Sequence, residues 1–179
     1  MDNEFQQIKQ KYDEFYNFLL KRGQLPIKDT GVGFWGISVG DEIFELFKRI
    51  HLEKFKHFID LGSGDGKVVL IASLFTDATG IEYDKWLHES AVDIQKKLSH
   101  IPRVSKATFT RKNFTDHSIT DYDIVFVNPD KPLHKGLENK LMLELNGKLI
   151  IHGPQFESQL LKKIETHDVN GTLVSIYSR

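Results

Sequence analysis

The sequence predicts an α/β domain with a doubly wound, mostly parallel sheet of seven strands, an added N-terminal helix and a C-terminal antiparallel hairpin. Short apolar runs alternate with helical patterns from residue 41 onwards, which is typical of successive β/α units. A glycine-rich turn follows the first of these runs. Near the C-terminus, Asn170-Gly171 separates two β-rich runs, and this dipeptide is a strong hairpin signal.

Length and composition limit the classes of protein to consider. The 179 residues suffice for one domain, and a hydrophobic content of 40% disfavours a disordered chain. A net charge of -1 disfavours a nucleic-acid coat or a polybasic membrane anchor. The chain has no cysteine and no close histidine pair, so we expect no metal. Without an apolar signal core or a membrane-length apolar run, we expect a soluble, cytoplasmic protein with no membrane partner.

Residues 1–40 are expected to extend the same domain. Apolar residues at three- and four-residue steps predict an amphipathic helix from Glu4 to Arg22. It either covers the core or gates a substrate, and the sequence does not separate these alternatives. The segment Leu25–Gly40 is rich in glycine and carries the pair Phe34 and Trp35, which is typical of a functional loop.

Residues 41–179 contain the predicted sheet. Five buried parallel strands are expected at His57–Leu61, Ala78–Glu82, Lys106–Arg111, Asp123–Val127 and Lys148–His152. Helices are expected at Asp41–Ile50, Lys67–Phe75, Lys85–Ser99, Leu133–Leu145 and Phe156–Glu165. The terminal hairpin is expected to pair His167–Val169 with Thr172–Tyr177.

The run Asp60-Leu61-Gly62-Ser63-Gly64-Asp65-Gly66 predicts a ligand site at a strand-to-helix turn. Its spacing matches neither a P-loop nor the dinucleotide fingerprint. The carboxylates of Asp60 and Asp65 would repel a pyrophosphate but complement an ammonium and a sulfonium. S-adenosylmethionine carries both cations and no phosphate. Glu82 ends the second strand, 20 positions beyond Gly62, where a ribose diol is expected, and Asp84 is expected to cap the next helix.

These two motifs resemble the first and second motifs of class I, seven-strand S-adenosylmethionine-dependent methyltransferases, whose fold is Rossmann-like. The resemblance implies a cofactor site made of Asp60, Gly62, Ser63, Gly64, Gly66, Glu82, Tyr83, Asn113 and Phe114. In that site Asn113 and Phe114 would meet the edge and face of the adenine. An ordinary turn asparagine is the alternative for Asn113.

The reacting end is expected after the fourth strand, at Asn128-Pro129-Asp130-Lys131. Amino-methylating families often carry Asn-Pro-Pro-aromatic there and use its oxygens to accept hydrogen bonds from the target nitrogen. Asp130 and Lys131 depart from that pattern. We expect Asn128, Pro129 and Trp35 to be catalytic. Trp35 and Phe34 either wall a channel for an amine or form a hydrophobic plug.

The order of motifs is also similar to small protein-lysine methyltransferases of the non-SET kind, which implies a protein substrate. Two alternatives stay open. Methylation of RNA or of a small-molecule amine would be favoured by a basic face around Arg103, Lys106, Arg111 and Lys112. The departure at Asp130 would instead fit a catalytically silent S-adenosylmethionine-binding protein.

Overall fold

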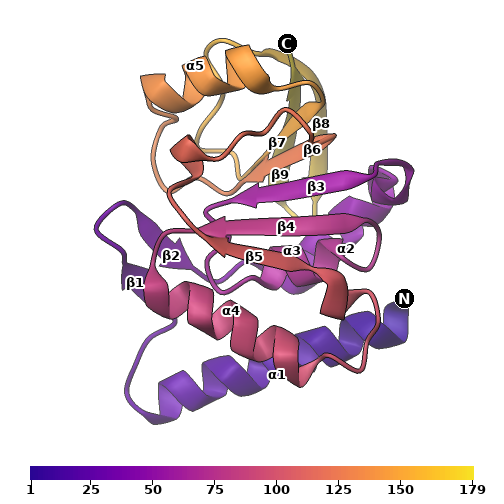
Figure 1. The fold of residues 1–179 in the computed structure, drawn as a ribbon, viewed down its shortest axis with the longest axis vertical. Helices are drawn as coiled ribbons and strands as arrows, with labels where there is room; N and C mark the ends of the chain where they lie inside the picture. Colours follow the sequence, from indigo (N-terminus) through magenta and orange to yellow (C-terminus); the bar gives the residue numbers. More distant parts are fainter.

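The computed structural model describes residues 1–179 and contains the predicted seven-stranded sheet (Figure 1). Its parallel strands are β3 (His57–Leu61), β4 (Asp77–Glu82), β5 (Thr108–Arg111), β6 (Ile124–Val127) and β7 (Lys148–His152). Antiparallel β8 (Lys162–Val169) and β9 (Thr172–Ser178) form the terminal hairpin. The spatial order β5-β4-β3-β6-β7-β9-β8 puts β3 and β6 at the centre.

The two faces of the sheet are covered unequally. The larger core cluster gathers side chains from α1 (Asp2–Lys21), α2 (Gly40–Arg49), α3 (Lys67–Ala72) and α4 (Lys85–Lys97). The opposite face carries only one α-helix, α5 (Lys135–Glu144), with the 3-10 turn η3 (Phe114–Asp116) beside it. Two further 3-10 turns are η1 (Leu52–Lys54) and η2 (Val104–Lys106).

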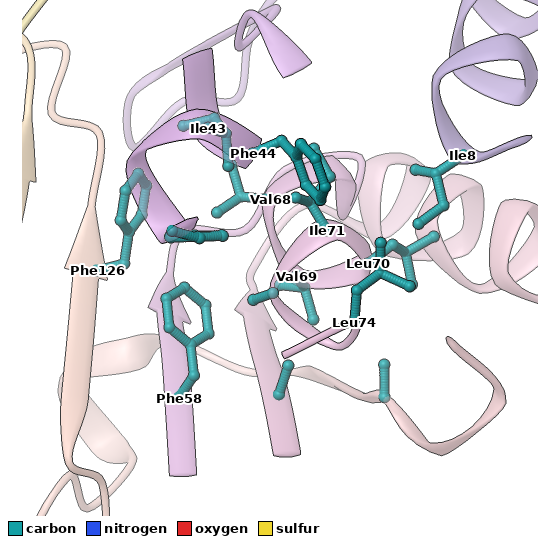
Figure 2. Packing of buried hydrophobic residues seen from close by; sticks show 14 of the residues in the cluster. Ile8, Ile43, Phe44, Phe58, Val68, Val69, Leu70, Ile71, Leu74 and Phe126 are labelled. Carbon is teal, nitrogen blue, oxygen red and sulfur yellow. The ribbon is translucent and has the colours of Figure 1, made fainter. Parts of the chain in front are cut away.

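Alternating side chains of the central strands fill both clusters. Phe58 and Phe126 point towards α2 and α3, where Figure 2 shows them near Ile43 and Val68. Ile59 and Val125 point to the opposite face, against α5. Because both faces of the sheet are covered, β6 is apolar and buried throughout, and β3 is apolar at Phe58, Ile59 and Leu61, as expected for strands at the centre of a parallel sheet.

The helix predicted at Phe156–Glu165 is wrong. Lys162 to Glu165 belong to β8, which pairs with β9 from Lys162 to Val169 with one irregularity between Lys163 and Glu165. The preceding connection is held by the buried carboxylate of Glu138, which accepts hydrogen bonds from the Ser158 hydroxyl at 2.7 Å and the Gln159 N–H at 2.8 Å. The local apolar spacing was helical, but pairing with the neighbouring strand decides the conformation.

The segment Leu25–Gly40 is more ordered than a loop. It contains a second, two-stranded sheet in which β1 (Ile27–Asp29) pairs antiparallel with β2 (Phe34–Gly36). Figure 1 shows this hairpin beside the carboxyl ends of the central strands. The side chains of α1 share the larger core cluster with α2 and α3.

Candidate functional site

The candidate site lies where the parallel strands end. Asp60 of β3 is in register with Gly80 of β4 and Phe126 of β6, so the segments that follow these strands meet at one edge of the sheet. Ligands of open α/β sheets bind at this edge, next to the strand where the order of connections reverses. Here the reversal falls between β3 and β6.

The turn after β3 needs its glycines for different reasons. Gly62, Gly64 and Gly66 have φ of 85°, 54° and 82°, which disfavours other L-residues. A Cβ at Gly66 would lie 2.7 Å from the Ala91 Cβ, so this glycine lets the turn pack against α4. A Cβ at Gly64 would lie 2.5 Å from the Trp35 ring. The structure thus assigns Gly66 a packing role in addition to the one expected from sequence.

The inner end of the turn holds polar groups that lack partners. Asp60 is 3% exposed and accepts no hydrogen bond; burial, followed by repulsion from Glu82 and Asp65, raises the pKa of its carboxyl. The Ser63 hydroxyl is buried without a partner as well. A cation beside Asp60 would compensate for this burial. The arrangement fits an ammonium or sulfonium group and disfavours a phosphate.

Glu82 joins the end of β4 to the glycine turn. Its Oε2 accepts a hydrogen bond from the Gly64 N–H at 2.8 Å, and its Oε1 accepts one from the Asp84 N–H at 2.7 Å. Burial raises the pKa of Glu82. Each oxygen keeps a second lone pair, so the carboxylate can still accept hydrogen bonds from a diol. Asp84 caps α4 at the Leu87 N–H, which confirms its predicted role, and Tyr83 is half exposed.

Asp65 faces the N-terminal helix, contrary to the expectation that it meets the ligand. Its carboxylate accepts a 2.6 Å hydrogen bond from the Tyr16 hydroxyl, and its backbone carbonyl accepts one from Tyr12 at 2.8 Å. The Lys67 ammonium lies 4.4 Å from the centre of the Tyr16 ring. Asp65 is buried among these groups because the turn packs directly on α1.

The β1–β2 hairpin connects the ends of β4 and β6. The Lys28 ammonium contacts the Asp84 carboxylate at 2.5 Å, next to β4. On the other side, the Phe34 N–H donates a 2.7 Å hydrogen bond to Asp130, and the Lys131 ammonium donates one to the Val32 carbonyl. Both attachments flank the glycine turn, so the hairpin lies over the edge at which the candidate site forms.

The paired aromatic residues of the hairpin have different environments. Trp35 is 8% exposed and packs on Gly64 and on the Trp86 ring, with 5.9 Å between ring centres. Phe34, its neighbour on β2, is 67% exposed because alternate residues of a strand face opposite sides. Phe34 therefore faces solvent, whereas Trp35 covers the glycine turn.

Asn128 lies exposed at the end of β6, as predicted, with the half-buried Pro129 after it. Its amide nitrogen is 3.4 Å from the Ser38 hydroxyl, and the Ser38 carbonyl accepts a 2.7 Å hydrogen bond from Lys67. The amide oxygen of Asn128 keeps its capacity to accept hydrogen bonds from an amine. His152, at the end of the adjacent β7, is buried 4.0 Å from Glu42, and burial lowers its pKa.

The adenine contacts expected after β5 are the weakest part of the site. Asn113 is exposed, and its side-chain oxygen accepts a 3.1 Å hydrogen bond from the Thr115 N–H, so it caps a turn. Phe114 packs against the cluster on the α5 face. The expected basic face is divided, because Arg103 and Lys106 precede β5 whereas Arg111 and Lys112 lie at its far end.

Sequence reasoning did not predict the contacts that hold the site together. These contacts join residues far apart in the sequence, for which local patterns carry no signal: they are made by Ser38, Lys28 and Asp130. The contacts of Tyr12 and Tyr16 could have been found from the sequence. Both tyrosines lie on the apolar stripe of the helix, and a buried tyrosine hydroxyl needs a hydrogen-bond partner.

One family of known proteins matches most of the chain. The family model described as "Histone methylation protein DOT1" matches residues 34–176, which include the hairpin strand β2 and all of the large sheet up to β9. A search of curated proteins finds no match. None of the helices is long and apolar enough to cross a membrane.

Several solved structures share the fold. An RNA methyltransferase from Salinibacter ruber in complex with S-adenosyl-L-homocysteine is 20% identical, with a TM-score of 0.60, covering 79% of this chain and 92% of its own. A TehB-like S-adenosylmethionine-dependent methyltransferase from Corynebacterium glutamicum is 14% identical, with a TM-score of 0.57 and coverages of 95% and 97%. A tRNA (uracil-54, C5)-methyltransferase from Pyrococcus abyssi is 15% identical, with a TM-score of 0.57 and coverages of 85% and 44%. At these identities the likeness concerns the fold.

Proposed function

This chain belongs to the family of the histone methylation protein DOT1, and from that premise we propose that it transfers a methyl group from S-adenosylmethionine to a lysine side chain of a protein. Its fold is that of class I S-adenosylmethionine-dependent methyltransferases. The observation that carries the proposal is Asn128, which presents a free amide oxygen at the same edge as the unpartnered carboxylate of Asp60.

The residues of the glycine turn suit this cofactor. Asp60 would pair with its ammonium, the Ser63 hydroxyl would gain a partner, and Glu82 would accept hydrogen bonds from the ribose hydroxyls. When bound, S-adenosylmethionine supplies a methyl group already activated by a sulfonium. The chain therefore has to align a nitrogen lone pair with that methyl group and exclude water.

Asn128 and the hairpin would perform those two tasks. The Asn128 amide oxygen accepts a hydrogen bond from the amine and so directs its lone pair. The substrate lysine must first lose a proton, which costs about 4 to 5 kcal/mol at pH 7 because the pKa of a lysine side chain in water is about 10.4. A site closed from water by the hairpin lowers this cost, because an apolar environment disfavours the ammonium form.

A protein substrate is supported by the surface around the hairpin. Exposed apolar side chains gather along this segment at Leu25, Ile27, Val32, Phe34, Ile37 and Val39. Such a rim is suited to a protein partner. The hairpin cation Lys28 is already paired with Asp84 and is less available to phosphates. Arg111 and Lys112 support the alternative of RNA, which the experiment below distinguishes.

The test is transfer of labelled methyl from S-adenosylmethionine into a cell extract, divided between protease and ribonuclease treatment. We expect protease-sensitive label that is recovered as methyl-lysine. Asn128→Ala should abolish the label, whereas Lys162→Ala, on the remote strand β8, should leave it unchanged. Ribonuclease-sensitive label would show that the substrate is RNA and not a protein. If the cofactor binds but no extract fraction is labelled, the chain is a silent binder and the proposal fails.

A further inference from the structure

A cavity of about 400 Å³ opens at the amino-terminal edge of the sheet, at the opposite end of the strands from the glycine turn. It lies between the starts of β3 and β4, the end of α3 and the segment that precedes β5. Its lining includes Lys56, Ser73, Asp77, Ala78, Arg103 and Lys106. None of these residues belongs to the site described above.

The cavity concentrates positive charge in a chain whose net charge is -1. Lys56, Arg103 and Lys106 take part in none of the ion pairs of the structure. Arg103 donates one hydrogen bond to the Leu74 carbonyl at 2.9 Å and keeps other N–H groups free. Asp77 is the one carboxylate of the lining, so three cations face one anion.

The other groups of the lining identify the kind of anion. The N–H groups of Lys56 and His57 are already bound by Asp123, so the flexible cationic side chains supply the donors. The apolar part of the lining is formed by the buried side chains of Phe75, Ala78 and Ala107. Without an exposed apolar side chain to insert, the cavity does not suit a lipid surface. Without an exposed aromatic ring, it does not suit stacking on a base.

The positive charge continues beyond the cavity. The segment 95–107 carries Lys96, Lys97, His100, Arg103 and Lys106 and contains no acidic residue. A linear polymer that carries successive phosphate groups could therefore contact this surface at more than one point. We propose that the cavity binds the phosphodiester backbone of a nucleic acid, without reading its sequence. This second site goes beyond the proposed methyl transfer and does not depend on it.

The test measures binding of a short labelled single-stranded RNA by fluorescence anisotropy, between about 50 mM and 200 mM salt. The double variant Lys56→Ala/Lys106→Ala removes two cavity cations. The control Lys21→Ala/Lys162→Ala removes the same charge from exposed positions on α1 and β8. Unchanged unfolding midpoints would establish that both double variants fold.

We expect the wild-type chain to bind the RNA and the cavity variant to bind at least tenfold more weakly. Each lost phosphate contact reduces the magnitude of the slope of log binding constant against log salt concentration by about 0.7. For the cavity variant, which loses two cations, the magnitude should decrease by about 1.4. Single-stranded DNA in a parallel arm should bind through the same residues. Equal losses in the two double variants, or binding of inorganic phosphate without binding of either nucleic acid, would overturn the proposal.

Discussion

Replacing Tyr16 by phenylalanine removes the hydroxyl that donates to Asp65 at 2.6 Å and leaves the ring in place. No cavity forms, so the change isolates one buried hydrogen bond to a carboxylate. Such a bond contributes about 1.5 to 3 kcal/mol, and we expect the free energy of unfolding to fall by about 2 kcal/mol near neutral pH. The glycine turn should also bind S-adenosylhomocysteine more weakly, because Asp65 belongs to it.

The pH dependence of this loss separates the hydrogen bond from a general packing defect. Burial raises the pKa of Asp65, and the Tyr16 hydroxyl opposes that shift. Without the hydroxyl, the pKa of folded Asp65 rises further. In the folded variant, Asp65 therefore stays protonated over a range of pH above its ordinary pKa of 3.8. The stability that the variant loses relative to the wild-type chain grows as pH rises through that range.

Urea unfolding at acidic and neutral pH measures the effect. Tyr12→Phe is the matched control, since its hydroxyl donates to the backbone carbonyl of the same Asp65 at 2.8 Å and not to the titrating carboxylate. We expect a pH-independent change there. A Tyr16→Phe variant that loses the same free energy at both pH values, or none at all, would refute the role of this hydrogen bond.

The contacts around the glycine turn determine three other responses. Gly64→Val should abolish cofactor binding in a calorimetric titration, because φ of 54° is strained for valine and its Cβ would overlap the Trp35 ring. Asp130→Ala should release the hairpin, so hydrogen exchange at the Phe34 amide should accelerate while that of the central strands stays slow. Burial lowers the pKa of Lys67 from 10.5 to about 8, so between pH 8 and 10.5 the unfolded chain binds more protons than the folded chain. The free energy of unfolding should therefore rise with pH across this range. In urea titrations, Lys67→Met should flatten that rise.

The sheet was predictable from sequence because its signals are local. A parallel strand buried on both faces is an apolar run, and the turn after β3 requires glycines at positive φ. The placement of Asp60, Glu82 and Asn128 at one edge then follows from the topology of parallel strands. These parts of the candidate site needed no knowledge of side-chain contacts.

Other features depend on contacts between distant residues, which local patterns do not encode. The hairpin is fastened to the end of β6 by Phe34 and Asp130, which are 96 positions apart. Asp65 was expected to contact a ligand because it lies in the glycine turn. In the structure its carboxylate instead accepts a hydrogen bond from Tyr16, 49 positions earlier. The helix expected before β8 failed for the same reason, since strand pairing overrode local periodicity.

The central claim is that the glycine turn binds a cationic ligand in preference to a phosphate-bearing one. Calorimetric titration of the wild-type chain with S-adenosylmethionine and, separately, with NAD tests it most directly. We predict one site for S-adenosylmethionine and no heat of binding for NAD, because the carboxylate of Asp60 repels a pyrophosphate. Binding of NAD, or no binding of S-adenosylmethionine to the folded chain, would contradict the account.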